Sequence, residues 1–135
     1  MVSTVAIGVD GSQTAAKAVE MGVDMARRFD AKVVLLSALH DSTASSSERD
    51  WSSDRSARVK HELETTESRV RRGGLECITL VDEGDPADVL VRLAEECGAD
   101  LLVVGSKGMQ RRVLGSVPNT VTHHAGCSVL VVKTT

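Results

Sequence analysis

The sequence predicts an α/β fold built on a parallel sheet, because short apolar runs alternate with longer amphipathic segments along its 135 residues. The apolar runs contain almost no charge, which is typical of strands buried on both faces. Five runs fit this description: residues 5–9, 33–39, 75–81, 101–104 and 127–132. Right-handed crossovers between the strands should place helices on both faces of the sheet. A chain of this length is expected to form one domain, residues 1–135.

The first strand and helix are expected at the start of the chain. The apolar run at residues 5–9 stops at Asp10. Ser12 suits the N-cap of a helix, because its hydroxyl can accept a hydrogen bond from the first turn. Apolar residues then recur at three-to-four spacing up to Phe29, which predicts a helix with one buried face.

The second strand, at residues 33–39, is followed by a segment of unusual composition. Residues 40–54 are rich in serine and poor in apolar residues, which predicts a surface loop. Residues 55–72 are highly charged but carry a thin apolar stripe, which predicts a surface helix with a narrow buried edge. Gly73 and Gly74 are expected to end this helix.

The second half of the chain contains clearer helix signals. After the third strand at residues 75–81, Asp85 suits an N-cap and Pro86 the first helical position. Gly98 should close that helix before the fourth strand at residues 101–104. A final short helix is expected at residues 116–125, ahead of the fifth strand.

Composition argues against several classes of function. The net charge of −3 gives no electrostatic reason to bind nucleic acid or an anionic membrane. Phe29 and Trp51 are the only aromatic residues, so a base-stacking platform is not expected. No apolar run approaches the roughly 18 residues that a membrane span needs. We therefore expect neither a nucleic-acid partner nor a membrane association.

The cysteines indicate a reducing compartment. Cys77, Cys97 and Cys127 are far apart in the sequence and form no CxxC pair, so neither a zinc site nor a redox dithiol is suggested. Buried free thiols are the simpler interpretation. The first ten residues lack the basic and apolar regions of a signal peptide. A cytoplasmic protein is therefore predicted.

Residues 101–118, LLVVGSKGMQRRVLGSVP, carry the strongest functional signal. They combine a buried strand, a basic glycine-rich loop and the start of a helix. Glycines allow close backbone approach, and the first N–H groups of a helix have no internal partner, so such a segment can bind phosphate. The glycines and cations of this loop are Gly105, Lys107, Gly108, Arg111, Arg112 and Gly115.

A crevice at the sheet edge would combine this loop with Asp10. In parallel α/β sheets, ligands bind beyond the carboxyl ends of strands where the winding reverses. If the first and fourth strands are neighbours, Asp10, Gly105 and Ser116 would face one crevice. Each also has an ordinary structural role: Asp10 and Ser116 could cap helices, and a glycine pair could form a tight turn.

Several segments together resemble the universal stress protein family. They are VAIGVDGS, GDPADVLVRLAEECGADLLVVGSKG, VLGSVPNTV and CSVLVVK, which cover nearly the whole chain. The family's phosphate motif has nine residues between its second and third glycines, the third being followed by Ser or Thr. Here only six residues separate Gly108 from Gly115, which precedes Ser116.

The resemblance implies a specific architecture and ligand. The sheet would have five parallel strands in the order 3-2-1-4-5, as in adenine nucleotide alpha hydrolase-like folds. The protein would bind ATP, with or without Mg²⁺, and would form a homodimer by pairing its last strand between Val129 and Val132. It would act as a sensor or regulator in a stress response.

The resemblance also assigns roles to individual positions. Gly8 and Val9 would lie at the adenine side, Asp10 would face the adenosine, and Ala38 would line the adenine pocket. The ribose and phosphates would meet Gly105, Lys107, Gly108, Gly115, Ser116 and Val117. Within the shortened loop, Arg111 and Arg112 are candidate cationic donors.

Catalytic signals are weak. The sequence has neither a GxSxG elbow nor a GxxxxGK[ST] loop. His123 and His124 are adjacent on a predicted helix, so they point ~100° apart and cannot both enter one site. No metal-ligand spacing links the histidines. Slow ATP hydrolysis is the most activity that we expect.

Two other functions remain open from the sequence. The short loop is also consistent with a dimeric interaction module that binds no ligand. Alternatively, a loop of this length would suit the single phosphate of AMP or cyclic AMP better than three phosphates.

Overall fold

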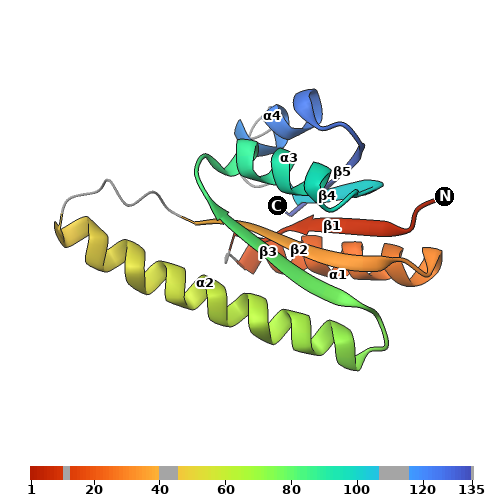
Figure 1. Cartoon of the computed structure of the whole chain (residues 1–135), viewed down its shortest axis with the longest axis horizontal. Coiled ribbons are helices and arrows are strands. Elements are labelled where there is room, and N and C mark those ends of the chain that lie inside the picture. The colour runs from red at the N-terminus through yellow and green to blue at the C-terminus, as the bar shows by residue number, and fades with distance from the viewer. Residues whose placement is uncertain (11–12, 40–45, 107–115, 135) are drawn as a thin grey trace.

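The computed structural model describes residues 1–10, 13–39, 46–106 and 116–134 (Figure 1). Strands and helices alternate along them. The elements are β1 (Thr4–Gly8), α1 (Gln13–Phe29), β2 (Lys32–Leu39), α2 (Ser46–Arg72), β3 (Cys77–Glu83), α3 (Pro86–Glu96), β4 (Leu101–Gly105), α4 (Ser116–His124) and β5 (Ser128–Val132).

The strands form one parallel sheet in the order β3-β2-β1-β4-β5, which confirms the predicted fold class. The chain moves outward from β1 to β2 and β3, then crosses back to β4 on the other side of β1. The direction of winding therefore reverses between β1 and β4. Their register pairs Ile7 with Val103, so the carboxyl ends of these two strands lie side by side.

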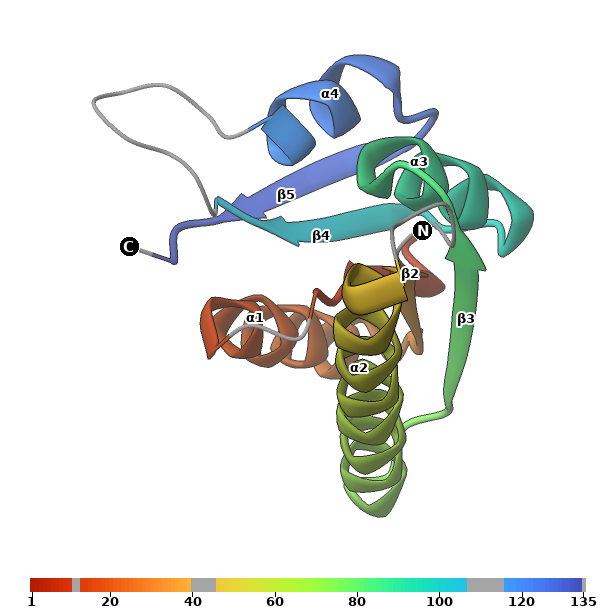
Figure 2. The same cartoon turned by 90° about the vertical axis from the view of Figure 1, so that its left-hand side faces the viewer.

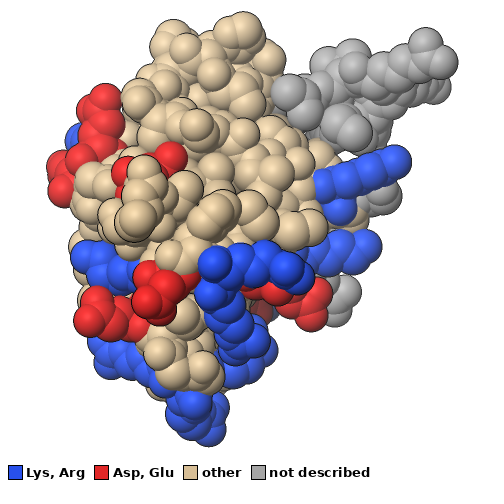
Figure 3. Space-filling model, turned by 90° about the vertical axis from the view of Figure 1, so that its right-hand side faces the viewer, with Lys and Arg blue, Asp and Glu red and all other residues tan. Residues whose placement is uncertain are grey.

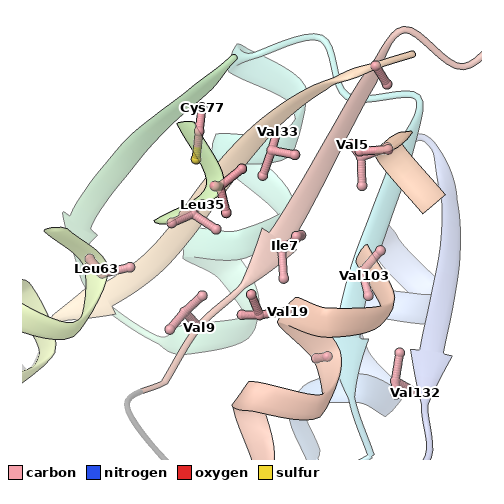
Figure 4. Close-up of a cluster of buried hydrophobic side chains, with 14 of the residues drawn as sticks. Val5, Ile7, Val9, Val19, Val33, Leu35, Leu63, Cys77, Val103 and Val132 are labelled. Carbon is pink, nitrogen blue, oxygen red and sulfur yellow. The ribbon is translucent and has the colours of Figure 1, made fainter. Parts of the chain in front are cut away.

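Helices cover both faces of the sheet, as Figure 2 shows: α1 and α2 lie on one side and α3 and α4 on the other. Alternate residues of each central strand enter opposite cores. In β1, Ile7 packs toward α1, while Ala6 packs toward α3. Figure 4 shows the first of these cores, where Ile7 and Val103 lie beneath the helix that carries Val19.

Gly22 allows α1 to approach the sheet closely. A Cβ atom at this position would lie 2.5 Å from Cδ1 and 2.7 Å from Cγ1 of Ile7, which is fully buried. Both distances are well below van der Waals contact, so only glycine fits between helix and strand. A glycine within a helix costs stability, and here the close packing of α1 on β1 explains why it is present.

Helix α2 is longer than predicted. The serine-rich residues 46–54, expected to belong to a surface loop, are helical, so that expectation was wrong for this stretch. No glycine or proline interrupts the sequence between Ser46 and Arg72, and a helix extends at little cost once packing has nucleated it. The packed part carries Val59, Leu63 and Val70. The preceding residues 40–45 lie outside the described ranges.

Strand β3 begins two residues later than predicted. The N–H group of Leu75 donates to the carbonyl of Val70 at 3.4 Å, as part of the closure of α2 at Gly73 and Gly74. Gly74 has φ of 94°, a left-handed conformation that favours glycine. Because Leu75 is used to close the helix, the ladder with β2 starts at Cys77.

The caps of α3 agree with the sequence analysis. The Asp85 side chain accepts a hydrogen bond of 3.2 Å from the Asp88 N–H group, and Pro86 is the first helical residue. Gly98 follows the helix with φ of 68°. Ser12, the expected cap of α1, lies outside the described residues. Within those ranges, no helix combines the length and apolarity that a membrane crossing requires.

Candidate functional site

The pairing of β1 with β4 brings two of the predicted site segments together. Asp10 follows β1 by two residues, and Gly105 is the last residue of β4. Since Ile7 pairs with Val103, continuing the register for two residues brings Val9 level with Gly105. This edge is the point where the winding reverses, the usual ligand-binding position in sheets of this type.

The backbone that carries Asp10 is held firmly at the end of β1. The N–H group of Val9 donates to the carbonyl of Leu36 at 2.8 Å. In the opposite direction, the Ser37 hydroxyl donates to the carbonyl of Val9 at 2.7 Å. Val9 is buried, whereas Asp10 is exposed. The end of β1 is thus fixed by these hydrogen bonds, and the exposed carboxylate that follows it can accept hydrogen bonds from ligand hydroxyl groups.

Gly8 and Ala38 border the same edge from β1 and β2. Gly8 pairs with Leu36, so Ala38 lies two residues further along the neighbouring strand. A Cβ atom on Gly8 would lie 3.1 Å from Cδ1 of Leu90, so this glycine lets α3 pack closely on the sheet. Ala38 is partly buried and packs against the core on that side. The positions that were expected to border the adenine thus lie at or next to the end of β1.

The predicted phosphate side is described only at its two ends. Gly105 and Ser106 end the segment on the β4 side, and Ser116 and Val117 begin α4. Ser116 is exposed and Val117 is partly buried against the α3-side core. Five predicted residues lie outside the described ranges: Lys107, Gly108, Arg111, Arg112 and Gly115.

Three polar residues near this edge were missed by sequence reasoning. Ser37, Ser106 and Thr134 are all buried, and each takes part in a hydrogen bond to a neighbouring segment. The signal for Ser37 was available, because a lone hydroxyl within the apolar run of β2 must find a partner. Thr134 follows the last strand at the end of the chain, where no pattern singles it out.

Among the residues that the structure describes, the other chemically reactive groups do not form a second site. All three cysteines are free thiols. Burial raises the pKa of Cys77 to about 11, and it also raises the pKa of Cys97 and of Cys127, so none is activated as a thiolate. Of the three, only Cys77 is fully buried. In the described part of the chain, no group of three or more metal-ligating side chains is found.

Charged side chains gather at the end of the molecule where the strands begin. Figure 3 looks onto the end where the amino ends of the strands lie, and shows Lys and Arg side chains beside Asp and Glu. Two ion pairs of 3.2 Å lie near the C-terminal ends of α1 and α2: Arg28 pairs with Asp24, and Arg71 pairs with Glu67. Cations paired in this way at helix ends are ordinary surface residues.

The chain resembles proteins of known family along nearly its whole length. The model of the universal stress protein family matches residues 1–133. A universal stress protein of Staphylococcus haemolyticus is 35% identical over 136 residues, which cover 95% of this chain and 82% of that protein.

Solved structures agree with the sequence relatives. A universal stress protein in complex with cAMP has a TM-score of 0.81 and 30% identity, with 99% of both chains covered. An Arabidopsis thaliana universal stress protein family protein with AMP bound has a TM-score of 0.77 and 27% identity, with 97% of this chain and 91% of that chain covered.

Proposed function

Since the chain belongs to the universal stress protein family, we propose that it is an adenine-nucleotide-binding stress-response protein that acts as a sensor or regulator. The observation that carries this proposal is the pairing of β1 with β4, which brings Asp10 and Gly105 to one edge of the sheet. Two relatives of similar fold were solved with cAMP and with AMP, which supports an adenine nucleotide as the ligand class.

The nucleoside would bind at the ends of β1 and β2. The Asp10 carboxylate would accept hydrogen bonds from ribose hydroxyls, because a charged acceptor makes the stronger type of hydrogen bond. Gly8, Val9 and Ala38 would border the adenine. Hydrogen bonds from Val9 to Leu36 and from Ser37 to Val9 would keep this region in place before the ligand arrives.

The phosphates would bind where β4 leads toward α4. N–H groups at the start of α4 are suited to anions, since they have no partner within the helix. The proposed phosphate-side residues are Gly105, Lys107, Gly108, Arg111, Arg112, Gly115, Ser116 and Val117. Three of them are cations, which favours a polyphosphate, and ATP is our first candidate.

Mg²⁺ could accompany the phosphates of ATP. This ion usually keeps several waters and takes only one or two carboxylates in addition to phosphate oxygens. Asp10 is an exposed carboxylate at the edge of the proposed site. The residues present therefore fit a nucleotide-bound Mg²⁺ ion.

AMP or cyclic AMP is the second candidate ligand. The six-residue spacer between Gly108 and Gly115 leaves less backbone to surround a triphosphate. The two relatives named above were also solved with single-phosphate nucleotides. A receptor for one of these would use the same nucleoside contacts.

We propose a homodimer formed through β5. This strand lies at one edge of the sheet, and its backbone is paired on one side only within the described residues. Val129, Leu130 and Val131 are partly exposed along it. An apolar edge strand can pair with a second copy of the chain.

We also propose that the protein binds rather than converts its nucleotide, with slow hydrolysis at most. Catalysis would need a positioned base or nucleophile.

The three free thiols suit a reducing compartment, which makes the cytoplasm our proposed location.

The direct test is mass spectrometry of ligand released from freshly purified protein, followed by calorimetry. ATP, ADP, AMP and cyclic AMP should be titrated with and without Mg²⁺, and GTP serves as the base-specificity control. We expect binding of at least one adenine nucleotide and none of GTP. Tighter binding of AMP or cyclic AMP than of ATP would select the second candidate. No heat and no thermal shift with any of them at millimolar concentration would overturn the proposal in favour of a ligand-free interaction module.

A further inference from the structure

Two buried hydroxyl groups join the carboxyl end of β4 to the segment that follows β5. The Thr134 N–H group donates to Oγ of Ser106 at 3.0 Å, and the two hydroxyl oxygens lie 3.4 Å apart. The Ser106 N–H group in turn donates to the carbonyl of Val132 at 2.9 Å. Ser106 is 1% exposed and Thr134 is 5% exposed, so both hydroxyls are removed from water.

The burial of these two hydroxyls depends on their contact with each other. Buried hydroxyls are unfavourable unless they are hydrogen-bonded. Here one contact between residues 28 positions apart gives both hydroxyls a partner. In Figure 2 the C-terminal end lies beside the carboxyl end of β4, in agreement with these bonds.

The pair also lies directly against the proposed nucleotide site. Gly105 precedes Ser106, and a Cβ atom on Gly105 would lie 3.1 Å from Cγ2 of Thr134. The methyl group of Thr134 therefore covers one side of Gly105, while its backbone and hydroxyl hold Ser106. Together these contacts determine where the chain leaves β4.

We propose that Thr134 is a positioning residue for the nucleotide site, which it serves through its buried contact with Ser106. The inference rests on the proposed function, because its effect on affinity presumes that an adenine nucleotide binds beside Gly105. A strand end held in place before binding loses less freedom when the ligand arrives. Nucleotide affinity therefore depends on a side chain at the C-terminal end of the chain that need not touch the ligand.

Two substitutions separate the hydroxyl from the rest of the side chain. Thr134→Val keeps the branched shape and the N–H group but removes the hydroxyl. Thr134→Ser keeps the hydroxyl and is the matched control. We expect calorimetry to show a Kd for the nucleotide about two- to tenfold higher in T134V, the range that corresponds to one neutral hydrogen bond, and a Kd within about twofold of wild type in T134S.

A double-mutant cycle tests whether the two hydroxyls act as a pair. Ser106→Ala combined with Thr134→Val should raise Kd by less than the product of the single effects, because each substitution breaks the same contact. Urea unfolding of the same variants provides the structural comparison. A loss of stability in T134V with an unchanged Kd would mean that the contact serves only the fold, and would overturn the proposal.

Hydrogen exchange in the nucleotide-free protein supplies a readout that does not need a ligand. The Ser106 amide should exchange faster in T134V than in wild type or T134S, while the Leu102 amide in the same strand should be unchanged. Equal exchange at Ser106 in all three proteins would overturn the proposal, as would equal weakening of binding by both substitutions. If wild type bound no adenine nucleotide, the proposed function would fall, and the exchange comparison alone would decide whether Thr134 positions Ser106.

Discussion

The Ser37 hydroxyl donates a 2.7 Å hydrogen bond to the backbone carbonyl of Val9, and so joins β2 to the chain at the end of β1, just before Asp10. Ser37 is 1% exposed. The ladder between β1 and β2 ends at Gly8 and Leu36, so this side-chain bond extends the connection beyond the regular strand. This bond supplies the carbonyl of the buried Val9 with a donor at the edge of the core.

Ser37→Ala should lower the free energy of unfolding by about 1–3 kcal/mol, because a buried carbonyl loses its partner. The nucleotide Kd should also rise, because Val9 immediately precedes Asp10 and fixes its position in the proposed site. Urea denaturation and calorimetry measure the two effects. Ser68→Ala, at an exposed position of α2, is the control: it should leave the Kd unchanged and change the free energy of unfolding by no more than about 0.5 kcal/mol. Unchanged stability of S37A would mean that water replaces the lost donor.

A second prediction concerns the close approach of α1 to β1. Gly22→Ala should destabilise the protein by about 1–2 kcal/mol, although alanine is the better helix former by roughly 1 kcal/mol. The added methyl would collide with Ile7, which is fully buried and cannot move freely. Chemical denaturation of the variant measures the change.

A second substitution, Ile7→Val, tests whether the collision with Ile7 causes the loss of stability in Gly22→Ala. Ile7→Val removes Cδ1, the atom nearest to the added methyl. In wild type, Ile7→Val should lower the free energy of unfolding by about 0.5–1.5 kcal/mol. In the Gly22→Ala background it should lower this free energy by less, or raise it. Additive losses would show that the collision at Ile7 is not responsible.

The third prediction concerns the pH dependence of stability. Oδ2 of Asp100 accepts hydrogen bonds from the N–H groups of Ser3 and Thr4 and from the Ser3 hydroxyl, and these bonds lower the pKa of Asp100. A carboxyl group whose pKa is lower in the folded state stabilises the fold above its unfolded pKa. That contribution is lost as the pH falls through the folded pKa.

Asp100→Asn should therefore reduce stability at pH 7, and its difference from wild type should shrink steadily below about pH 4, near the ordinary pKa of an aspartate. Urea unfolding at a series of pH values measures this difference. Glu62→Gln, on the exposed side of α2, serves as the control. A constant difference between D100N and wild type across the series would contradict the assignment to the ionised carboxylate.

The strands were predictable because their apolar runs are specific to buried parallel strands, and the structure confirms all five within two residues at each boundary. The neighbouring positions of β1 and β4 did not follow from periodicity, since that pattern carries no information about which strands pair. The helical conformation of residues 46–54 was not predicted, because serine-rich sequence is typical of loops. The extension of α2 depends instead on packing farther along the helix, at Val59 and Leu63.

The proposed site was predictable to a lesser extent. Glycines and charged residues such as Asp10 stand out in a sequence, and the structure brings Asp10 and Gly105 to one edge. The hydroxyls of Ser106 and Thr134 do not stand out in the same way. Ser106 and Thr134 become partners only because β5 lies beside β4, a tertiary relationship that no local pattern reveals.

The final prediction tests the role of Asp10 in the proposed nucleotide contact. If its carboxylate accepts hydrogen bonds from ribose hydroxyls, Asp10→Ala should raise the Kd for ATP by about 10- to 100-fold, the range for a hydrogen bond to a charged group. The same substitution should have little effect on 2′,3′-dideoxy-ATP, because that ligand lacks both hydroxyls. Calorimetry with the two ligands and the two proteins forms a closed cycle. Equal losses for ATP and its dideoxy analogue would place Asp10 away from the ribose hydroxyls, and equal losses that occur only in the presence of Mg²⁺ would point to a phosphate-bound Mg²⁺ ion as its partner.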